Sequence, residues 1–383
     1  MSALETVQLA PARTPSALGP LKVSELRVET VSDYQKFLDL KPAWDRLVDA
    51  AGIEHPFLEH DWIRTWWDCF GSGSALHIVL IHAGSDLIAI APLILTTVRI
   101  LGIRMRRLGF FSNEHVPRAD FIISRHSEHV YRAIWNHLRR EKCWDVLRLC
   151  QLTDDSETLD VLTTLASRDG CGWGLWISSS SPYIDLALRK PWRSYLDGLE
   201  QKFKANLRNR FNRLRDIQVV TATKPDAEQL QAVLDIEAAA WKGRAGTAIL
   251  CNPSVRRFYT EFADRAGRRG WLRLNFLRTA GVPIACDYSL EYKKSIFVLK
   301  SGYDPAHAAF SPTNLLHCRA IEDAFARGLK RYDFLGDAAE WKMRWTKQTT
   351  QYFWLFVFPR TLKGELLYTL KFQLIPLLKR IRR

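Results

Sequence analysis

One stretch decides the fold, Lys300-Ser-Gly-Tyr-Asp-Pro-Ala-His-Ala-Ala-Phe-Ser-Pro-Thr-Asn-Leu-Leu316. An apolar strand ends at Lys300, and Ser311-Pro312 opens a helix, because serine caps helix N-termini and proline suits the first helical turn. A helix N-terminus presents unpaired N–H groups and the positive end of the helix dipole, which favours a bound phosphate. An ordinary capped helix without a ligand is the alternative interpretation.

The sequence on either side of this stretch predicts a compact β–helix–β pattern. Three strands precede it and are predicted over 271–277, 284–290 and 295–300; a helix over 313–327 and a strand over 332–335 follow. The first half of the chain has the same order, with strands over 76–82 and 87–93, a helix over 129–142 and a strand over 144–149. Local matches support an internal repeat: Gly84 and Ile88-Ala89 correspond to Gly281 and Ile284-Ala285.

The repeat predicts an α/β (α+β) protein with two similar halves. Each half is expected to hold a mostly antiparallel sheet with flanking helices. We predict a flexible N-terminal arm over 1–25, an N-terminal half over 26–190, a C-terminal half over 191–360 and a basic amphipathic tail over 361–383.

Composition bounds the class of protein. The 383 residues are 47% hydrophobic and 25% charged, with a net charge of +14, which describes a globular chain that favours anionic partners. Seven cysteines without a Cys-x-x-Cys pair argue against disulfides and structural zinc, and no histidine pattern predicts a metal site. No signal peptide or transmembrane stretch is recognised, so a cytoplasmic protein is expected.

A basic amphipathic helix is predicted between the halves, over 201–215. Its apolar positions recur at helical spacing, and lysines and arginines surround them; the apolar residues are Phe203, Leu207, Phe211 and Leu214. The basic face is either a solvated surface or an anion-binding one.

Several chemistries are disfavoured by missing motifs. The chain has no phosphate-binding Gly-x-x-x-x-Gly-Lys-Ser/Thr, no dinucleotide fingerprint and no Gly-x-Ser-x-Gly elbow. ATP hydrolysis, nicotinamide chemistry and serine-dependent acyl hydrolysis are therefore poorly supported.

A set of motifs in the second half resembles a known family. The motifs are Trp241-Lys-Gly-Arg-Ala-Gly-Thr247, Tyr303-Asp304, Ser311-Pro312 before Leu315-Leu316, and Asp333-Phe-Leu-Gly-Asp337 followed by Trp341-Lys342. Together they resemble the GNAT-type acyltransferases of the cellulose-biosynthesis CelD-like group, which are related to the Fem aminoacyl transferases by a tandem GNAT fold. The resemblance spans roughly residues 28–358.

The resemblance implies acyl transfer from acyl-CoA to an amine without a metal. Ser311, Thr313 and Asn314 match the family's pyrophosphate turn, although Thr313 stands where the family has glycine, and a Cβ there limits close approach of a ligand. Asp287 or Asp333 is a candidate base and Tyr303 a candidate proton donor to the leaving thiolate. Candidate substrate-binding residues are Trp241, Lys242, Arg244, Lys300 and Lys342. Structural roles are the alternative for each of these side chains.

We therefore expect an N-acyltransferase, acting with acetyl-CoA on an amine of a small molecule or of a cell-envelope or polysaccharide precursor. A Fem-like transferase that uses aminoacyl-tRNA and a non-catalytic component of exopolysaccharide assembly are the alternatives. In the tail, Leu362, Leu366, Leu370 and Leu374 recur every four residues among basic side chains. This pattern predicts either contact with an anionic membrane or a last helix docked on the protein.

Overall fold

The computed structural model describes residues 26–100, 102–188, 191–214 and 216–374. The predicted arm over 1–25 and the end of the predicted tail, residues 375–383, lie outside the described residues. In the described part of the chain no helix has both the length and the apolar character needed to cross a membrane.

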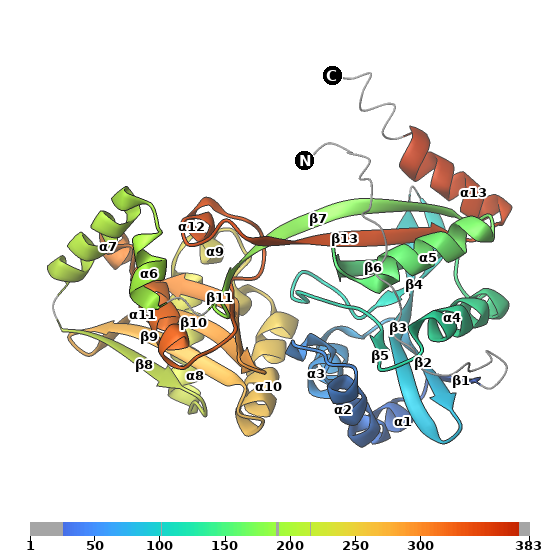
Figure 1. The fold of residues 1–383 in the computed structure, drawn as a ribbon, viewed down its shortest axis with the longest axis horizontal. Coiled ribbons are helices and arrows are strands. Elements are labelled where there is room, and N and C mark those ends of the chain that lie inside the picture. Colours follow the sequence, from blue (N-terminus) through green and yellow to red (C-terminus); the bar gives the residue numbers. More distant parts are fainter. Residues whose placement is uncertain (1–25, 101, 189–190, 215, 375–383) are drawn as a thin grey trace.

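One mixed sheet of 13 strands forms the centre of the molecule (Figure 1). Twelve strands follow the order β1-β2-β3-β4-β6-β13-β7-β12-β11-β10-β9-β8, and β5 pairs with β3. The strands are β1 (Leu26–Val31), β2 (Ser74–Ala83), β3 (Asp86–Ile100), β4 (Ile103–Phe110), β5 (Ile122–Ile123), β6 (Val146–Thr153), β7 (Gly172–Asp185), β8 (Ile217–Ala222), β9 (Leu272–Thr279), β10 (Val282–Tyr292), β11 (Ser295–Tyr303), β12 (Arg331–Asp333) and β13 (Thr349–Phe358).

The expectation of two separate sheets is wrong, because two long strands cross from one half to the other. Strand β7 pairs with β13 over Gly172–Pro182 and then with β12 over Tyr183–Asp185. Strand β13, from the C-terminal end of the chain, lies between β6 and β7. Figure 1 shows β7 and β13 running side by side between the halves. Their length of 14 and 10 residues lets them pair at both ends and merge the sheets.

Thirteen α-helices cover this sheet in the described ranges. They are α1 (Tyr34–Asp39), α2 (Lys41–Ala50), α3 (His60–Phe70), α4 (Ser127–Glu141), α5 (Glu157–Arg168), α6 (Trp192–Asp197), α7 (Gln201–Arg213), α8 (Ala227–Ala239), α9 (Trp241–Arg244), α10 (Pro253–Arg268), α11 (Pro312–Ala326), α12 (Glu340–Met343) and α13 (Leu362–Tyr368). Short turns of helix are η2 (Pro56–Leu58), η3 (Ile249–Cys251), η4 (Pro305–Phe310) and η5 (Thr369–Leu374). Side-chain caps explain several starts, such as the capping box of Asp226 and Gln229 at α8.

The two halves share one order of strand pairing. Strands β2, β3 and β4 pair antiparallel, and after α4 the strand β6 pairs parallel with β4. Strands β9, β10 and β11 do the same, and after α11 the strand β12 pairs parallel with β11. Both crossover helices follow a left-handed residue, His126 at φ 56° and Ser311 at φ 46°. The repeated pattern expected from the sequence is present in the topology, while the exact domain limits stay a prediction.

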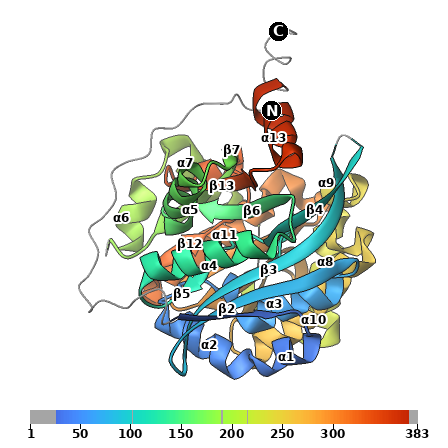
Figure 2. The ribbon, with the colours of Figure 1, turned by 90° about the vertical axis from the view of Figure 1, so that its right-hand side faces the viewer.

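Aromatic packing joins the halves. Trp62 of α3 meets Phe258 and Phe262 of α10 edge-on, with ring centroids 5.1 and 4.7 Å apart. Such geometry adds about 0.5–1.5 kcal/mol per pair beyond area burial. In the N-terminal half, α4 and α5 lie next to each other over the sheet (Figure 2).

The described part of the tail docks on β7 and β13. Leu367 is buried, and Phe372 packs on Trp176 and Phe356. Leu362, Leu366 and Leu374, however, are 89%, 50% and 42% exposed. The described part of the tail is therefore docked on the protein and still exposes these three leucines.

Candidate functional site

The candidate site lies where the parallel strands β11 and β12 separate. They pair only over Ser295–Phe297 and Arg331–Asp333. Strand β12 then ends, whereas β11 continues to Tyr303. Helix α11 packs on β9, β10 and β11, so its first turns lie over the end of this strand pair.

A buried carboxyl group and a buried imidazole face each other here. Asp287 of β10 and His317 of α11 are fully buried, and His317 Nδ1 lies 3.4 Å from Asp287 Oδ2 and 2.9 Å from the Tyr332 hydroxyl. Burial raises the pKa of Asp287 to about 7, while Ser301 and the charge of Lys242 act in the opposite direction. Burial lowers the pKa of His317 to about 3, so the imidazole is neutral. A carboxyl group that titrates near neutral pH is suited to accept a proton.

The segment after β12 closes over His317. The Trp341 ring stacks on His317 with centroids 5.2 Å apart and an interplanar angle of 16°. Lys342 Nζ donates to the Leu335 carbonyl at 2.5 Å, and burial lowers the pKa of Lys342 to about 8. Lys342, a candidate substrate-binding residue from the sequence, therefore lies close enough to His317 for its charge to act on the imidazole.

Lysines on the other side of β11 form a second group. Lys242 Nζ donates to Glu237 Oε1 at 3.0 Å and to the Ser301 carbonyl at 2.8 Å. Lys300 lies over the Tyr259 ring at 5.6 Å, and burial followed by the Lys242 charge lowers its pKa. The two lysines, both candidates from the sequence, thus lie close enough for the charge of Lys242 to act on Lys300.

Asp333 is fully engaged by the protein. Its Oδ2 accepts from Arg118 Nη2 at 2.5 Å and from Arg331 Nε at 3.0 Å, and its Oδ1 accepts from the Leu335 N–H at 3.0 Å and from Ser181 Oγ at 3.3 Å. Because four donors already use this carboxylate, Asp287 is the better placed of the two predicted bases. Arg118 comes from the other half, so this ion pair also ties the halves together.

The predicted phosphate turn has fewer unpaired donors than expected. The Ser311 N–H bonds Ala308 and the Asn314 N–H bonds Ser311, while Pro312 has none. In this turn the Thr313 N–H alone is left without a backbone partner among the described residues. Ser311 holds the N-cap position, but its side chain makes no capping bond, since its backbone is left-handed. The Oδ1 atom of Asn314 is buried and unpaired.

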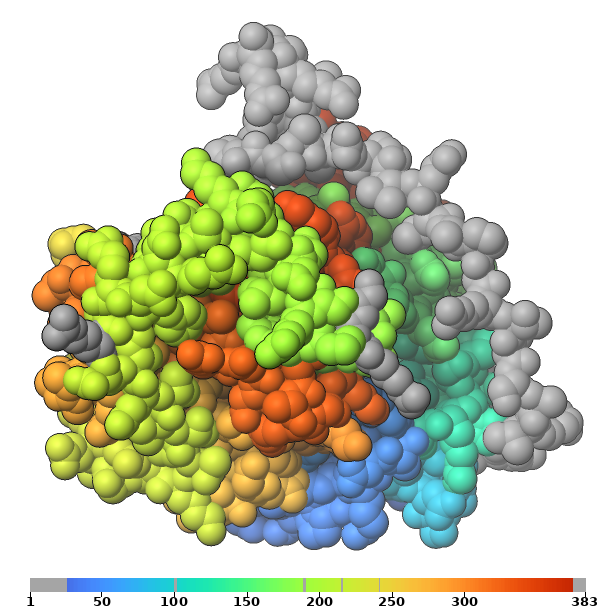
Figure 3. Space-filling view, turned by 60° about the vertical axis from the view of Figure 1, so that its left-hand side comes forward, coloured from blue at the N-terminus to red at the C-terminus, as the bar shows by residue number. Residues whose placement is uncertain are grey.

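Helix α7 supplies cations beside this turn. Phe203 and Leu207 are buried as predicted, and the helix packs on α11. The Arg213 guanidinium lies 5.2 Å from the centre of the Phe310 ring, which immediately precedes Ser311. The basic face therefore borders the predicted phosphate turn. Figure 3 shows α6 and α7 in yellow-green at the molecular surface.

Three further predicted residues are less connected. Tyr303 is half-buried at the end of β11, and Arg244 is exposed on α9. The side chain of Trp241 lies outside the described part of the structure.

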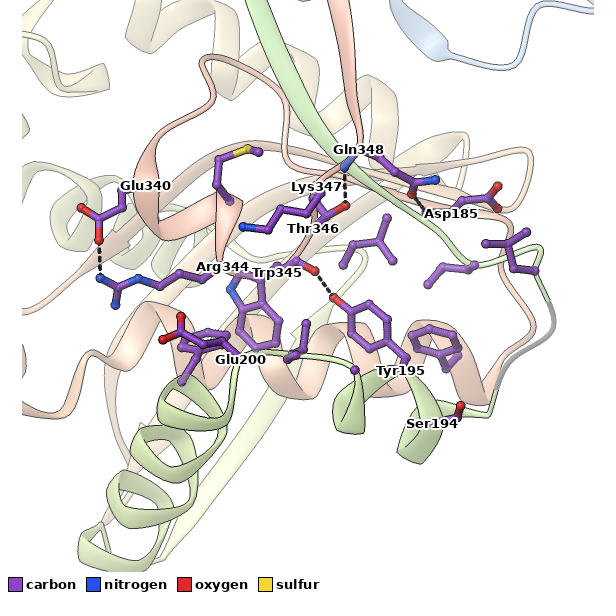
Figure 4. Close-up of a pocket in the computed structure, with 18 of the residues that line it drawn as sticks. Asp185, Ser194, Tyr195, Glu200, Glu340, Arg344, Trp345, Thr346, Lys347 and Gln348 are labelled. Carbon is purple, nitrogen blue, oxygen red and sulfur yellow. Dashed lines mark hydrogen bonds and ion pairs between the residues drawn. The ribbon is translucent and has the colours of Figure 1, made fainter.

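A hollow lies beside the segment of Trp341 and Lys342, and Asp287 does not line it. It has a volume of about 770 Å³ and opens between α6, α7 and residues 340–348 (Figure 4). Tyr195 donates to the Trp345 carbonyl at 2.6 Å across it, and Lys202 and Lys347 also line it. The segment that carries Trp341 and Lys342 continues into its wall, so the hollow is a candidate acceptor pocket.

Metal-ligand residue types meet elsewhere. In the described ranges, one group offers potential ligand atoms within 4.8 Å of one another, namely His77, Glu141 and Cys143. His77 Nε2 lies 2.8 Å from Glu141 Oε2, so the imidazole and the carboxylate already contact each other directly.

Residues that sequence reasoning missed include His317, Glu237 and Arg118. His317 follows Asn314 by three residues and so shares its helix face, which is a usable signal. Arg118 carries no such signal, because 215 residues separate it from Asp333.

Comparisons with known proteins agree with this architecture. Residues 201–343 match the family described as Acetyltransferase (GNAT) domain. FemX has a similar fold, with a TM-score of 0.59 at 11% identity over 86% of this chain and 98% of that chain. A tandem GNAT protein from the clavulanic acid biosynthesis pathway gives 0.50 at 13% identity, with the same coverage.

The C-terminal domain of a putative lysylphosphatidylglycerol synthetase from Agrobacterium fabrum gives a TM-score of 0.55 at 9% identity, over 86% of this chain and 95% of that chain. No curated protein sequence matches the chain. The chain thus carries a segment similar to GNAT acetyltransferases within a fold like those of FemX and tandem GNAT proteins.

Proposed function

We propose that this protein is an N-acyltransferase that moves an acyl group, in the first instance acetyl, from acyl-CoA to an amine. One observation carries the proposal: parallel strands β11 and β12 separate beside the start of α11, within the segment that matches the GNAT domain. The amine belongs to a small molecule or a cell-envelope or polysaccharide precursor.

In this reaction the amine nitrogen attacks the thioester carbonyl carbon, an amide bond forms and the carbon–sulfur bond breaks. The amine must lose a proton and the thiolate must gain one. Asp287 takes the amine proton by way of Ser301, which pairs with it across β10 and β11. Tyr303, two residues further along β11, supplies the proton to sulfur.

The diphosphate of acyl-CoA lies at the start of α11 in this proposal. The Thr313 N–H and the dipole of a 15-residue helix attract it, and Arg213 adds an exposed cation from α7. Charge-assisted hydrogen bonds contribute about 1.5–3 kcal/mol each, so affinity depends strongly on this turn.

Calorimetry with acetyl-CoA tests the placement. Replacing Ser311 and Thr313 with glutamate should abolish binding, because two negative charges would face the diphosphate. Ser127→Glu at the start of α4 is the matched control and should leave binding unchanged. Unchanged affinity in the double variant would place the acyl donor elsewhere.

An aminoacyl-tRNA donor is the second candidate function, and the basic face of α7 favours it. Arg208 and Arg213 on that helix are exposed, as a partner rich in phosphate requires. Saturable binding of tRNA but not of acetyl-CoA would replace the first proposal with this one. Binding of neither would favour a non-catalytic role in polysaccharide assembly.

A further inference from the structure

A second, smaller hollow lies in the N-terminal half, away from the proposed acyl-transfer site. Its volume is about 210 Å³, and two arginines lie in its floor. The strand registers place the floor residues in two rows of cross-strand partners. Thr96 lies between Ser74 and Arg107 in one row, and Gly109 lies between Ile94 and Arg148 in the other. Trp66 and Phe70 of α3 form an aromatic wall, and Ser112 and Asn113 lie at the end of β4. We call this hollow the arginine pocket.

The arginines in this pocket have no acidic partner within the described ranges of the chain. Arg107 Nε donates to Thr96 Oγ1 at 3.0 Å, and Arg148 lies 5.4 Å from the Trp354 ring centre. Neither forms an ion pair with any residue that the structure describes. Other partly buried arginines of this protein do, as Arg118 shows with Asp333.

A third cation increases the charge at this place. Lys371 of η5 lies 4.3 Å from the Phe356 ring centre, and Phe356 pairs with Arg148 across β13 and β6. Burial, followed by the charge of Arg148, lowers the pKa of Lys371 to about 8 and that of Arg107 to about 10. Both pKa values fall because burial and the neighbouring positive charge disfavour the protonated forms, and a bound anion would counteract both effects.

The arginine pocket occupies a special position in the topology. Strands β4 and β6 pair in parallel over Arg107–Gly109 and Val146–Arg148, after which β4 ends and β6 continues. This is the same separation of parallel strands that marks the site in the other half. Gly109 permits the close approach of β4 and β6 at the last pair before they separate, since a Cβ there would lie 2.3 Å from the Arg148 carbonyl oxygen.

We propose that the arginine pocket binds an oxyanion, a carboxylate or a phosphate ester, carried by a small molecule with a flat apolar part. Arg107 and Arg148 present planar guanidinium groups that match the geometry of such oxygens. Ser112 and Asn113 add neutral donors, and the flat part lies against Trp66 and Phe70. The site is independent of the acyl donor proposed for the other half.

The test is calorimetric titration of the full chain with phenyl phosphate, benzoate and inorganic phosphate, without acyl-CoA. Saturable binding of phenyl phosphate or benzoate supports the site, and the tighter of the two identifies the preferred oxyanion. Inorganic phosphate should bind more weakly than phenyl phosphate, because it makes no contact with the aromatic wall.

Arg148→Gln should weaken binding of the preferred probe by about tenfold to a hundredfold, as expected for loss of one charge-assisted contact. Arg104→Gln is the matched control on β4, since Arg104 is exposed and lines no part of the pocket. If Arg148→Gln does not fold, Arg148→Lys, which keeps the charge but loses the planar fork, should still weaken binding. Absence of binding by both aromatic probes, or equal affinity in the Arg148 and Arg104 variants, would overturn the proposal.

Discussion

Replacing Asp287 with asparagine should stabilise the folded protein at high pH while it stops acyl transfer. Burial raises the pKa of this carboxyl from 3.8 to about 7 in the folded state. Between these two values the folded protein holds a proton that the unfolded chain has released. Stability of the wild-type protein therefore falls as pH rises through this range, and the full penalty is present above pH 7.

The size of the effect follows from the shift. A difference of about 3 pKa units at about 1.36 kcal/mol per unit corresponds to about 4 kcal/mol. Asparagine has nearly the same shape and no charge, so Asp287→Asn should remove this penalty. The gain should be largest at pH 8 and should shrink toward zero near pH 4.

Urea unfolding at several pH values between 4 and 8 measures the gain, as the difference in free energy of unfolding between variant and wild type. Asp86→Asn is the matched control, because Asp86 lies in an exposed ion pair with Arg125. Its difference from wild type should change little with pH. A flat difference for Asp287→Asn as well would refute the raised pKa.

The same variant should lose about a hundredfold to ten-thousandfold in kcat/KM, the usual contribution of a general base. Wild-type activity should fall below pH 7, because Asp287 must be ionised to accept the amine proton. A variant that keeps activity and this acid limb would assign the base to another group.

Three other outcomes are expected. Arg118→Ala should lower the free energy of unfolding by about 3 kcal/mol in urea titrations, because it leaves the buried Asp333 with one cation fewer. Arg132→Ala, at an exposed ion pair, is the control, and an equal loss in both variants would contradict the expectation. Thr313→Gly should tighten acetyl-CoA binding in calorimetry, since it removes a Cβ beside the free N–H; unchanged affinity would remove Thr313 from the site. The full chain should float with anionic liposomes at low salt. The double variant Leu362→Ser, Leu366→Ser should not float, because it removes two exposed leucines of the tail. Equal flotation of both proteins would show that these leucines do not bind membranes.

Local interactions account for the features that could be predicted from sequence. The apolar spacing of Phe203 and Leu207 identifies the buried face of α7, because helix periodicity depends on neighbouring residues. Pro312 locates the start of α11, because its fixed φ suits the first helical turn, although the Ser311 side chain makes no capping bond. The turns at Gly84 and Gly281 follow from positive φ angles of 62° and 80° that glycine adopts without strain.

Tertiary structure decided which of these local features acquire chemical roles. Two of the donors to Asp333, Arg331 and the Leu335 N–H, are near it in the sequence. The other two, Arg118 and Ser181, reach this carboxylate only through the fold, and no local pattern announces them. The merging of two sheets into one likewise depends on β7 and β13, whose strand partners lie far away in the chain. Pairing and burial are long-range properties, and the pKa of a carboxyl group depends on both of them.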